Sequence, residues 1–223
     1  MPVTVGYAQS GLQSGAKMLT PQFLNVGATE AIPLQAITPV GSDTSDNIYI
    51  HILNAAGISV AGYAWIDWAG EESDQEAWVD EDTFEIIEGV TFEPGQGLWI
   101  YGSSSEQGIQ TAGKVGSSDI TFTLRNGAVG VGNPFPVSVD LQDILPGGSD
   151  TSDNVYIHIL NAAGISVAGY AWIDWAGEES DQEAWVDEDT FEIVEGVSFE
   201  PGQGLWVYGS SSEQSITFPA PEL

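Results

Sequence analysis

Hydrophobic and polar residues alternate with a period of two through much of the chain. In residues 48–53, isoleucine occupies positions 48, 50 and 52, while Tyr49, His51 and Leu53 occupy the positions between them. Residues 119–125 alternate in the same way, with apolar side chains at 120, 122 and 124. A period of two places successive side chains on opposite faces of a β-strand. We therefore predict an all-β fold, with helix limited to short turns near residues 34–37 and 141–144.

Turn signals separate these strands. The segment 54–57 (Asn-Ala-Ala-Gly) predicts a turn after which the run to Trp68 returns antiparallel. Pro94 and Gly95 fit the centre of a type II turn, which leads into a strand at 98–101. The chain has 27 glycines and 11 prolines spaced between short strands, a composition typical of a β-sandwich or barrel.

A long segment of the sequence occurs twice. Residues 41–107 and 148–214 align without a gap, and 63 of the 67 positions are identical. We call each of these two copies a cassette. A more divergent segment, the leader, precedes each cassette, and one leader plus one cassette is about the size of an ordinary domain. We predict two tandem β-sandwich or jelly-roll-like repeats of about 105–110 residues each. The first comprises residues 1–115 (leader 1–40, cassette 41–107), and the second comprises residues 116–223 (leader 116–147, cassette 148–214).

The net charge of −30 comes from 33 acidic residues and only 3 basic ones. Affinity for nucleic acid and for anionic membranes depends on Lys and Arg, so both partners are excluded. Of the acidic residues, 28 lie in the two cassettes, which contain no Lys or Arg. Cysteine is absent, and no apolar run is long enough to insert in a bilayer. Residues 1–5 do not begin a signal peptide, so we expect a mature chain or one made without a signal.

Acidic loops are the first candidate site. Carboxylates that crowd together without basic neighbours repel one another, and a hard cation such as Ca²⁺ would neutralise them. The alternative interpretation is a solvated acidic loop. The cation hypothesis assigns ten ligands, five in each cassette: Asp43, Asp46, Asn47, Asp80, Asp82, Asp150, Asp153, Asn154, Asp187 and Asp189. No other cofactor is predicted.

Aromatic residues are the second candidate. In the strand ending at Trp68, Tyr63, Trp65 and Asp67 share one face. An aromatic face with a carboxylate could stack and hydrogen-bond a sugar, while burial between two sheets explains the same residues as core. The corresponding face of the second copy carries Tyr170, Trp172 and Asp174. His51 and His158 each lack a second His nearby, so we interpret them as ordinary strand residues and not as metal ligands.

One family resemblance is visible in the sequence. The elements Asn126-Gly, Gly-Asn-Pro-Phe-Pro at 132–136 and Pro-Gly-Gln-Gly-Leu-Trp at 201–206 resemble β modules of bacterial secreted and surface proteins, which read "GWNLVGNPYP … PGQGFWV". The first copy has Thr-Pro-Gln-Phe at 20–23 in place of the Asn-Pro element. The resemblance implies an accessory β domain without catalytic residues, in an extracellular or cell-surface setting.

These observations favour a non-enzymatic structural protein that assembles with itself, such as the subunit of an extracellular filament, coat or virion layer. Two near-identical cassettes present the same surface twice, and such surfaces can form open polymers. The joint between molecules would be an edge strand or a swapped terminal strand, and the candidates are residues 3–7 and 215–218. The alternative function is a secreted carbohydrate-binding or adhesive module. A hydrolase using paired carboxylates is a third hypothesis, although neither a nucleophile elbow nor a phosphate loop occurs.

Overall fold

The chain folds into β-sheets throughout its described part, which confirms the predicted all-β class. The structure is a computed structural model and describes residues 5–12, 15–19, 31–54, 56–68, 75–93, 96–114, 118–161, 163–175 and 182–221. In these ranges the chain forms 20 strands and two single-turn 3₁₀-helices, which lie where the short helical turns were predicted.

The first half contains β1 (Val5–Gly11), β2 (Gly15–Leu19), β3 (Ile32–Pro33), η1 (Leu34–Ala36), β4 (Thr38–Val40), β5 (Tyr49–Leu53), β6 (Ser59–Asp67), β7 (Glu76–Asp80), β8 (Thr91–Phe92), β9 (Leu98–Gly102) and β10 (Gly108–Lys114). The second half contains β11 (Ile120–Thr123), β12 (Gly127–Gly132), β13 (Val139–Asp140), η2 (Leu141–Asp143), β14 (Leu145–Gly147), β15 (Tyr156–Leu160), β16 (Ser166–Asp174), β17 (Glu183–Asp187), β18 (Ser198–Phe199), β19 (Gly204–Gly209) and β20 (Ser215–Phe218).

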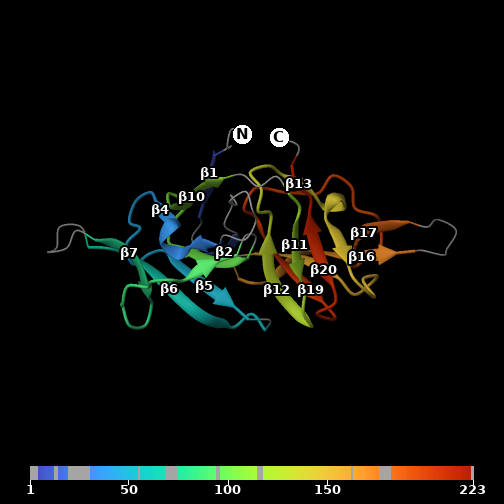
Figure 1. Cartoon of the computed structure of the whole chain (residues 1–223), viewed down its shortest axis with the longest axis horizontal. Coiled ribbons are helices and arrows are strands. Elements are labelled where there is room, and N and C mark those ends of the chain that lie inside the picture. The colour runs from blue at the N-terminus through green and yellow to red at the C-terminus, as the bar shows by residue number, and fades with distance from the viewer. Residues whose placement is uncertain are drawn as a thin grey trace.

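Both halves arrange their strands in the same three antiparallel sheets. The first half has sheets β2-β9-β5-β6-β7, β1-β10-β4 and β3-β8, and the second has β12-β19-β15-β16-β17, β11-β20-β14 and β13-β18. The registers agree as well, since Tyr49 pairs with Ala64 and Tyr156 pairs with Ala171. Figure 1 shows the halves side by side along the long axis, with β7 and β17 toward opposite ends. The predicted boundary at 115/116 lies outside the described residues.

Each five-stranded sheet packs one face against the smaller sheets of its own half. In the first half, Ile50, Trp65 and Ile100 pack with Phe92 of β8 and Ile109 of β10 in a single core. At the equivalent place in the second half, the core contains Ile157, Trp172, Val207, Phe199 and Ile216. The predicted alternation in residues 48–53 is confirmed: Ile48 and Ile50 are fully buried in this core, and Ile52 packs against it.

Trp78 anchors the first core. Its side chain is fully buried, and its Nε1–H donates a 2.8 Å hydrogen bond to the carbonyl of Ile37, which follows η1. Gln35 in η1 binds the Trp78 backbone in both directions, through its amide nitrogen at 3.0 Å and its amide oxygen at 3.0 Å. Trp185, Ile144 and Gln142 repeat these contacts in the second half. The 3₁₀-helix thus fixes the strand that carries the tryptophan.

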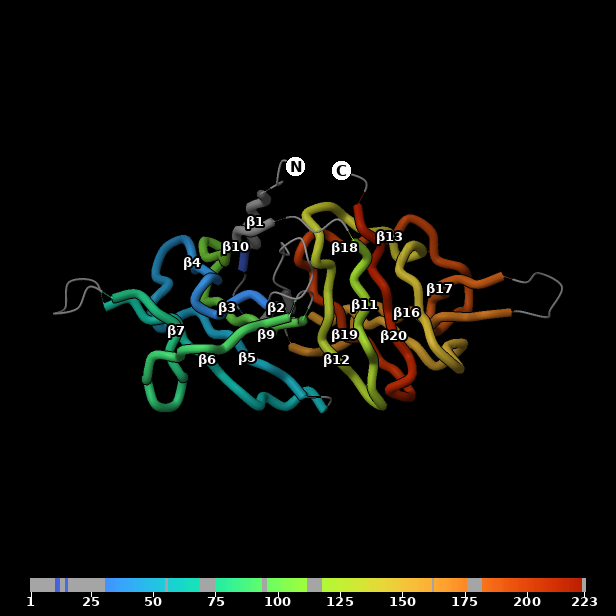
Figure 2. The backbone as a smooth tube through the Cα atoms, in the orientation of Figure 1, coloured from blue at the N-terminus to red at the C-terminus, as the bar shows by residue number. Residues whose placement is uncertain are grey.

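The two halves meet through backbone and aromatic contacts. The Gly97 N–H donates a 2.8 Å hydrogen bond to the Gly130 carbonyl, next to a bridge between Gln96 and Val131. A Cβ added at Gly97 would lie 2.6 Å from the Gly130 carbonyl carbon, so only glycine permits this approach. Figure 2 shows β2 and β9 of the first half beside β12 and β19 of the second near the centre of the molecule.

Strand position decides which ends of the chain can serve as joints between molecules. β1 and β11 are edge strands of their sheets in the described part of the chain, so residues 5–7 keep the edge position that was predicted for 3–7. Residues 3 and 4 lie outside the described residues. Residues 215–218 do not form an edge, because β20 is the central strand of its sheet and both its edges are paired. Exchange of this terminal strand between chains stays a prediction.

Candidate functional site

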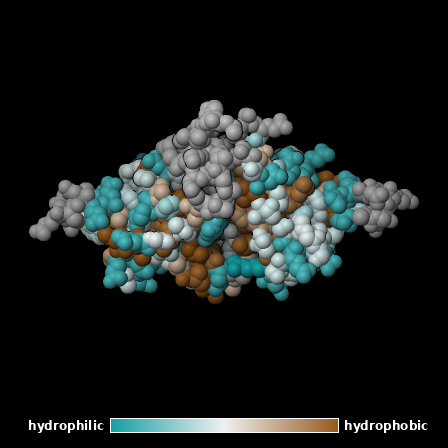
Figure 3. All heavy atoms as spheres, viewed as in Figure 1, coloured by the Kyte–Doolittle hydropathy of each residue, from teal (hydrophilic) through white to brown (hydrophobic). Residues whose placement is uncertain are grey.

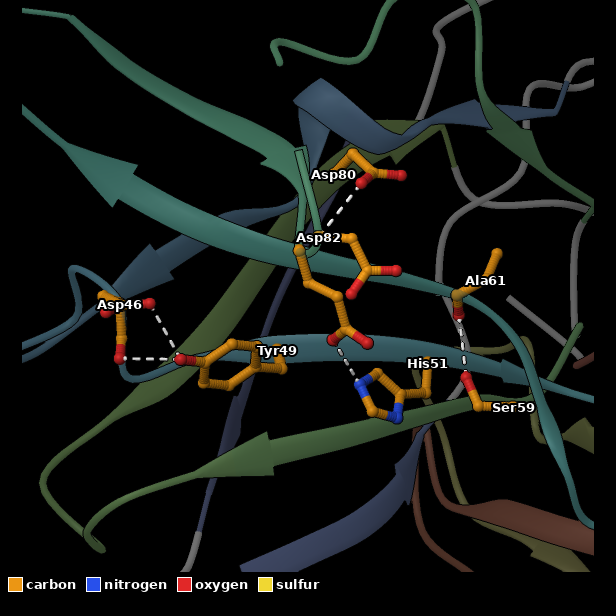
Figure 4. A network of polar contacts seen from close by, with 8 residues as sticks. Asp46, Tyr49, His51, Ser59, Ala61, Asp80 and Asp82 are labelled. Carbon is orange, nitrogen blue, oxygen red and sulfur yellow. Dashed lines mark hydrogen bonds and ion pairs between the residues drawn. The ribbon is translucent and has the colours of Figure 1, made fainter. Parts of the chain in front are cut away.

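The acidic loops use their carboxylates to hold local turns. Asp43 and Asp46 have left-handed φ angles of 51° and 52°, a conformation that short polar side chains tolerate. Asp46 accepts a 2.8 Å hydrogen bond from the Tyr49 hydroxyl (Figure 4). The Asn47 amide nitrogen donates to the Ser45 carbonyl at 3.0 Å. The second copy repeats these roles at Asp150, Asp153 and Asn154.

The pKa of the tyrosine in this turn is raised in both copies. Partial burial raises the pKa of Tyr156 to about 12, and the hydrogen bond to the Asp153 carboxylate adds to the rise. Burial and Asp46 raise the pKa of Tyr49 in the same direction. Both tyrosines therefore stay protonated and act as hydrogen-bond donors at neutral pH.

Asp80 caps the turn that follows β7. Its Oδ1 accepts hydrogen bonds from the backbone N–H groups of Thr83 at 2.9 Å and Asp82 at 3.0 Å. Figure 4 shows the bond from Asp82. These two bonds lower the pKa of the Asp80 carboxyl, because they favour its charged form. Asp187 is held in the same way by Thr190 and Asp189, and its pKa is also lowered.

The predicted cation ligands do not gather into one group. Among the residues the structure describes, no three acidic or histidine side chains lie where they could hold a metal ion together. The densest acidic stretches, at 71–74 and 178–181, lie outside the described residues. Asp46, Asp80 and their counterparts accept hydrogen bonds within their own turns, and the Ca²⁺ hypothesis stays a prediction.

Replacing Asp80 and Asp187 should lower the thermal stability of the chain by an amount that depends on pH. The lowered pKa means that the carboxylates stabilise the fold above their ordinary pKa of about 3.9, and that this stabilisation disappears as pH falls through the lowered value. We expect Asp80→Asn with Asp187→Asn to have a lower Tm than the parent chain at pH 7. The difference should shrink as pH falls and vanish below the lowered pKa of the two carboxyls, as differential scanning calorimetry would measure. A Tm difference that persists unchanged at low pH would contradict the assignment.

The interpretation of the aromatic face of β6 as a sugar-binding platform is wrong. Tyr63 and Trp65 are buried in the core, and the Trp65 and Trp78 rings meet edge to face at 5.5 Å. Asp67 is half-buried at the end of the strand. A ring enclosed on both sides offers no face for a sugar, so the packing alternative explains these residues. Tyr170, Trp172 and Asp174 take the same places in the second copy.

His51 has a charged partner that the sequence analysis missed. Its Nε2 lies 2.7 Å from a carboxylate oxygen of Glu81, thirty residues away (Figure 4). Glu81 reaches it across Gly62, where a Cβ would collide with the carboxylate. His158, Glu188 and Gly169 form the same arrangement. With Nε2 engaged, each ring has its Nδ1 without a hydrogen bond among the described residues.

A cleft lies between the two halves and brings their aromatic residues together. It has a volume of about 460 Å³. Tyr101 and Tyr208 line it, together with residues at the tips of the β5–β6 and β15–β16 hairpins. Trp99 and Trp206, each 6% exposed, also line the cleft and pack with Ala128. The lining consists of His51, Leu53, Ala56, Gly57, Ser59, Trp99, Tyr101, Leu160, Ala163, Gly164, Trp206 and Tyr208.

The lining of the cleft contains no Asp, Glu, Lys or Arg, in a chain of net charge −30. The His51 and Tyr101 rings lie 4.8 Å apart between centroids and are tilted by 59°, so the ring that binds Glu81 also contacts an aromatic residue of the cleft. Alternation in residues 98–101 is the sequence signal for this site, because it places Trp99 and Tyr101 on the face opposite the core. Sequence alone does not show that the same face of the other copy closes over it.

Comparisons with known protein families, with curated proteins and with solved structures gave no significant match to the chain. The resemblance to bacterial surface modules therefore stays a prediction. In the described part of the chain, no helix has the length and apolar character required to cross a membrane.

Proposed function

We propose that this chain is a non-enzymatic structural protein that assembles with copies of itself, in an extracellular or cell-surface layer. The observation that carries the proposal is a set of four exposed aliphatic side chains at equivalent positions of the two repeats. Each is 62% exposed, and we call them the hairpin quartet: Ile58, Val60, Ile165 and Val167.

The hairpin quartet lies where charge does not oppose association. Residues 54–66 and 161–173 contain no charged side chain, whereas the chain as a whole carries 33 acids. Like-charged copies repel one another over acidic surface, so contacts between them form most readily over neutral apolar surface. Figure 3 shows hydrophobic surface at the lower centre of the molecule, where Figure 1 places the β5–β6 hairpin.

The partner we propose is a second copy of the chain. Both hairpin tips line the same cleft, so the two pairs of aliphatic residues belong to one central region of the molecule. An edge strand in each half, β1 and β11, adds backbone groups that can pair with another chain. Near-identical repeats supply equivalent contact surfaces, which is the condition for a repeating assembly.

Removing the hairpin quartet should abolish self-association. We expect the parent chain to sediment faster as its concentration rises. The variant Ile58→Asn, Val60→Thr, Ile165→Asn, Val167→Thr should sediment as a monomer at every concentration, because it lacks the apolar contact but keeps the chain's charge. Sedimentation velocity over a wide concentration range measures the difference.

Phe84 and Phe191 provide the matched control. They are also exposed, at 53% and 54%, and both have φ of 57°, a left-handed value that asparagine adopts more readily than phenylalanine. The variant Phe84→Asn with Phe191→Asn should fold and associate like the parent chain. A parent chain that stays monomeric, or a quartet variant that still associates, would refute the proposal.

A further inference from the structure

We propose that the cleft between the two repeats is a binding site for a neutral glycan. The donors, the charge and the shape of the cleft support this assignment, which does not depend on the proposed self-assembly. The residues concerned differ from the sugar platform considered from the sequence, whose aromatic rings lie in the core.

Hydrogen-bond donors in the cleft call for a ligand rich in acceptors. Trp99 and Trp206 are each 94% buried and line the cleft, and their indole N–H groups have no acceptor among the described residues. The core residues Trp78 and Trp185, in contrast, donate to backbone carbonyls at 2.8 Å and 2.7 Å. Buried indole N–H groups usually find a partner, so the two cleft tryptophans are suited to a ligand that supplies oxygen atoms.

Polar groups in the wall of the cleft extend this set. The hydroxyls of Tyr101 and Tyr208 have no protein hydrogen bond among the described residues, and the Nδ1 atom of His51 has none either. Ser59 donates its hydroxyl to the Ala61 carbonyl at 3.2 Å, which leaves its oxygen as an acceptor. A sugar ring satisfies such a mixture, because each of its hydroxyls both donates and accepts while its C–H faces pack on apolar and aromatic walls.

The charge of the cleft and of the whole chain limits which oxygen-rich ligands can bind. No Lys or Arg lines the cleft, and the net charge of −30 repels uronic acids, sulfated sugars and phosphates. An ammonium or guanidinium group brings donors alone and would leave both indole N–H groups without acceptors. A neutral polyhydroxylated ligand remains, and the cleft's volume of about 460 Å³ lies within the roughly 300–1,000 Å³ of ligand pockets.

Both repeats are needed to build this site. Five pairs of equivalent positions line it, among them Leu53 with Leu160, Trp99 with Trp206 and Tyr101 with Tyr208. Each repeat therefore supplies half of the aromatic wall. The two near-identical cassettes thus contribute equivalent residues to one site at their junction.

The test is calorimetric titration of the full chain with cellohexaose, xylohexaose and mannohexaose, and with polygalacturonate as the anionic comparison. We expect at least one neutral glycan to bind and polygalacturonate not to bind. Trp99→Phe with Trp206→Phe keeps an aromatic ring but removes both indole N–H groups, and it should weaken binding about tenfold or more.

Two further double variants separate a loss of ligand contacts from a loss of folding. Tyr101→Phe with Tyr208→Phe removes only two hydroxyls, so it tests the site with little change in packing and should weaken binding by a similar factor. Trp68→Phe with Trp175→Phe alters half-buried tryptophans of other clusters, and binding should be unchanged. Absence of binding to all three neutral glycans, preferential binding of polygalacturonate, or equal affinity in the cleft variants and the parent chain would overturn the proposal. Because the cleft variants keep the hairpin quartet, loss of glycan binding is distinguishable from loss of self-association.

Discussion

Trp78→Ala should lower the free energy of unfolding of the first repeat by about 3–5 kcal/mol. The substitution removes a fully buried indole that is in contact with Trp65 at 5.5 Å between ring centres. It also leaves the Ile37 carbonyl without the hydrogen bond that Nε1 donates at 2.8 Å. The cavity and the lost bond act together, because both lie where η1 packs on β7. Urea unfolding followed by circular dichroism measures the effect.

The duplicated sequence supplies two comparisons for this result. Trp185→Ala removes the equivalent residue of the second repeat and should have a similar effect there. Trp68→Ala changes a half-buried tryptophan and should cost much less. A loss below about 1 kcal/mol for Trp78→Ala would show that this residue does not anchor the core.

Gly97→Ala should destabilise the junction between the repeats by about 1–3 kcal/mol. The new methyl group would lie 2.6 Å from the carbonyl carbon of Gly130 and 2.9 Å from the backbone nitrogen of Val131. Backbone atoms cannot rotate away as a flexible side chain can, so the two halves must separate locally. The 2.8 Å hydrogen bond from Gly97 to Gly130 would then be lost. Thermal unfolding measured by calorimetry reports the cost.

Gly11→Ala is the matched control for this substitution. Nothing lies within 4 Å of a Cβ built on Gly11, so the same chemical change meets no obstacle there. We expect its Tm to stay close to that of the parent chain. Equal stability of Gly97→Ala and Gly11→Ala would contradict the close backbone approach between the repeats.

The sequence predicted the fold class well because its main signals are local. Alternation in residues 48–53 is a property of one strand, and the structure buries Ile48 and Ile50 as that alternation requires. The turn at 54–57 joins β5 to β6 as predicted, because the Asn54 side chain accepts hydrogen bonds from the backbone of Ala56 at 2.9 Å and Ile58 at 3.1 Å. Side chains that hold their own turn can be recognised without tertiary information.

The candidate site was harder to predict because it depends on contacts between distant residues. Tyr63 and Trp65 share a face in the sequence pattern, but only the tertiary packing shows that this face is the core. Trp99 and Tyr101 share a face too, and it becomes a cleft only because the other repeat supplies the opposite wall. The pairing of His51 with Glu81 spans thirty residues and depends on the bare backbone of Gly62.

Electron microscopy of the negatively stained full chain, at low and high salt and with a chelator, tests the proposed assembly most directly. An apolar joint between chains of net charge −30 should form more readily at high salt, because ions screen the repulsion between copies. We predict filaments or sheets that become more abundant as salt is raised and that persist in the chelator. Single particles of one chain under every condition would contradict the account, and assemblies that dissolve in chelator would show that a cation, and not the hairpin quartet, joins the molecules.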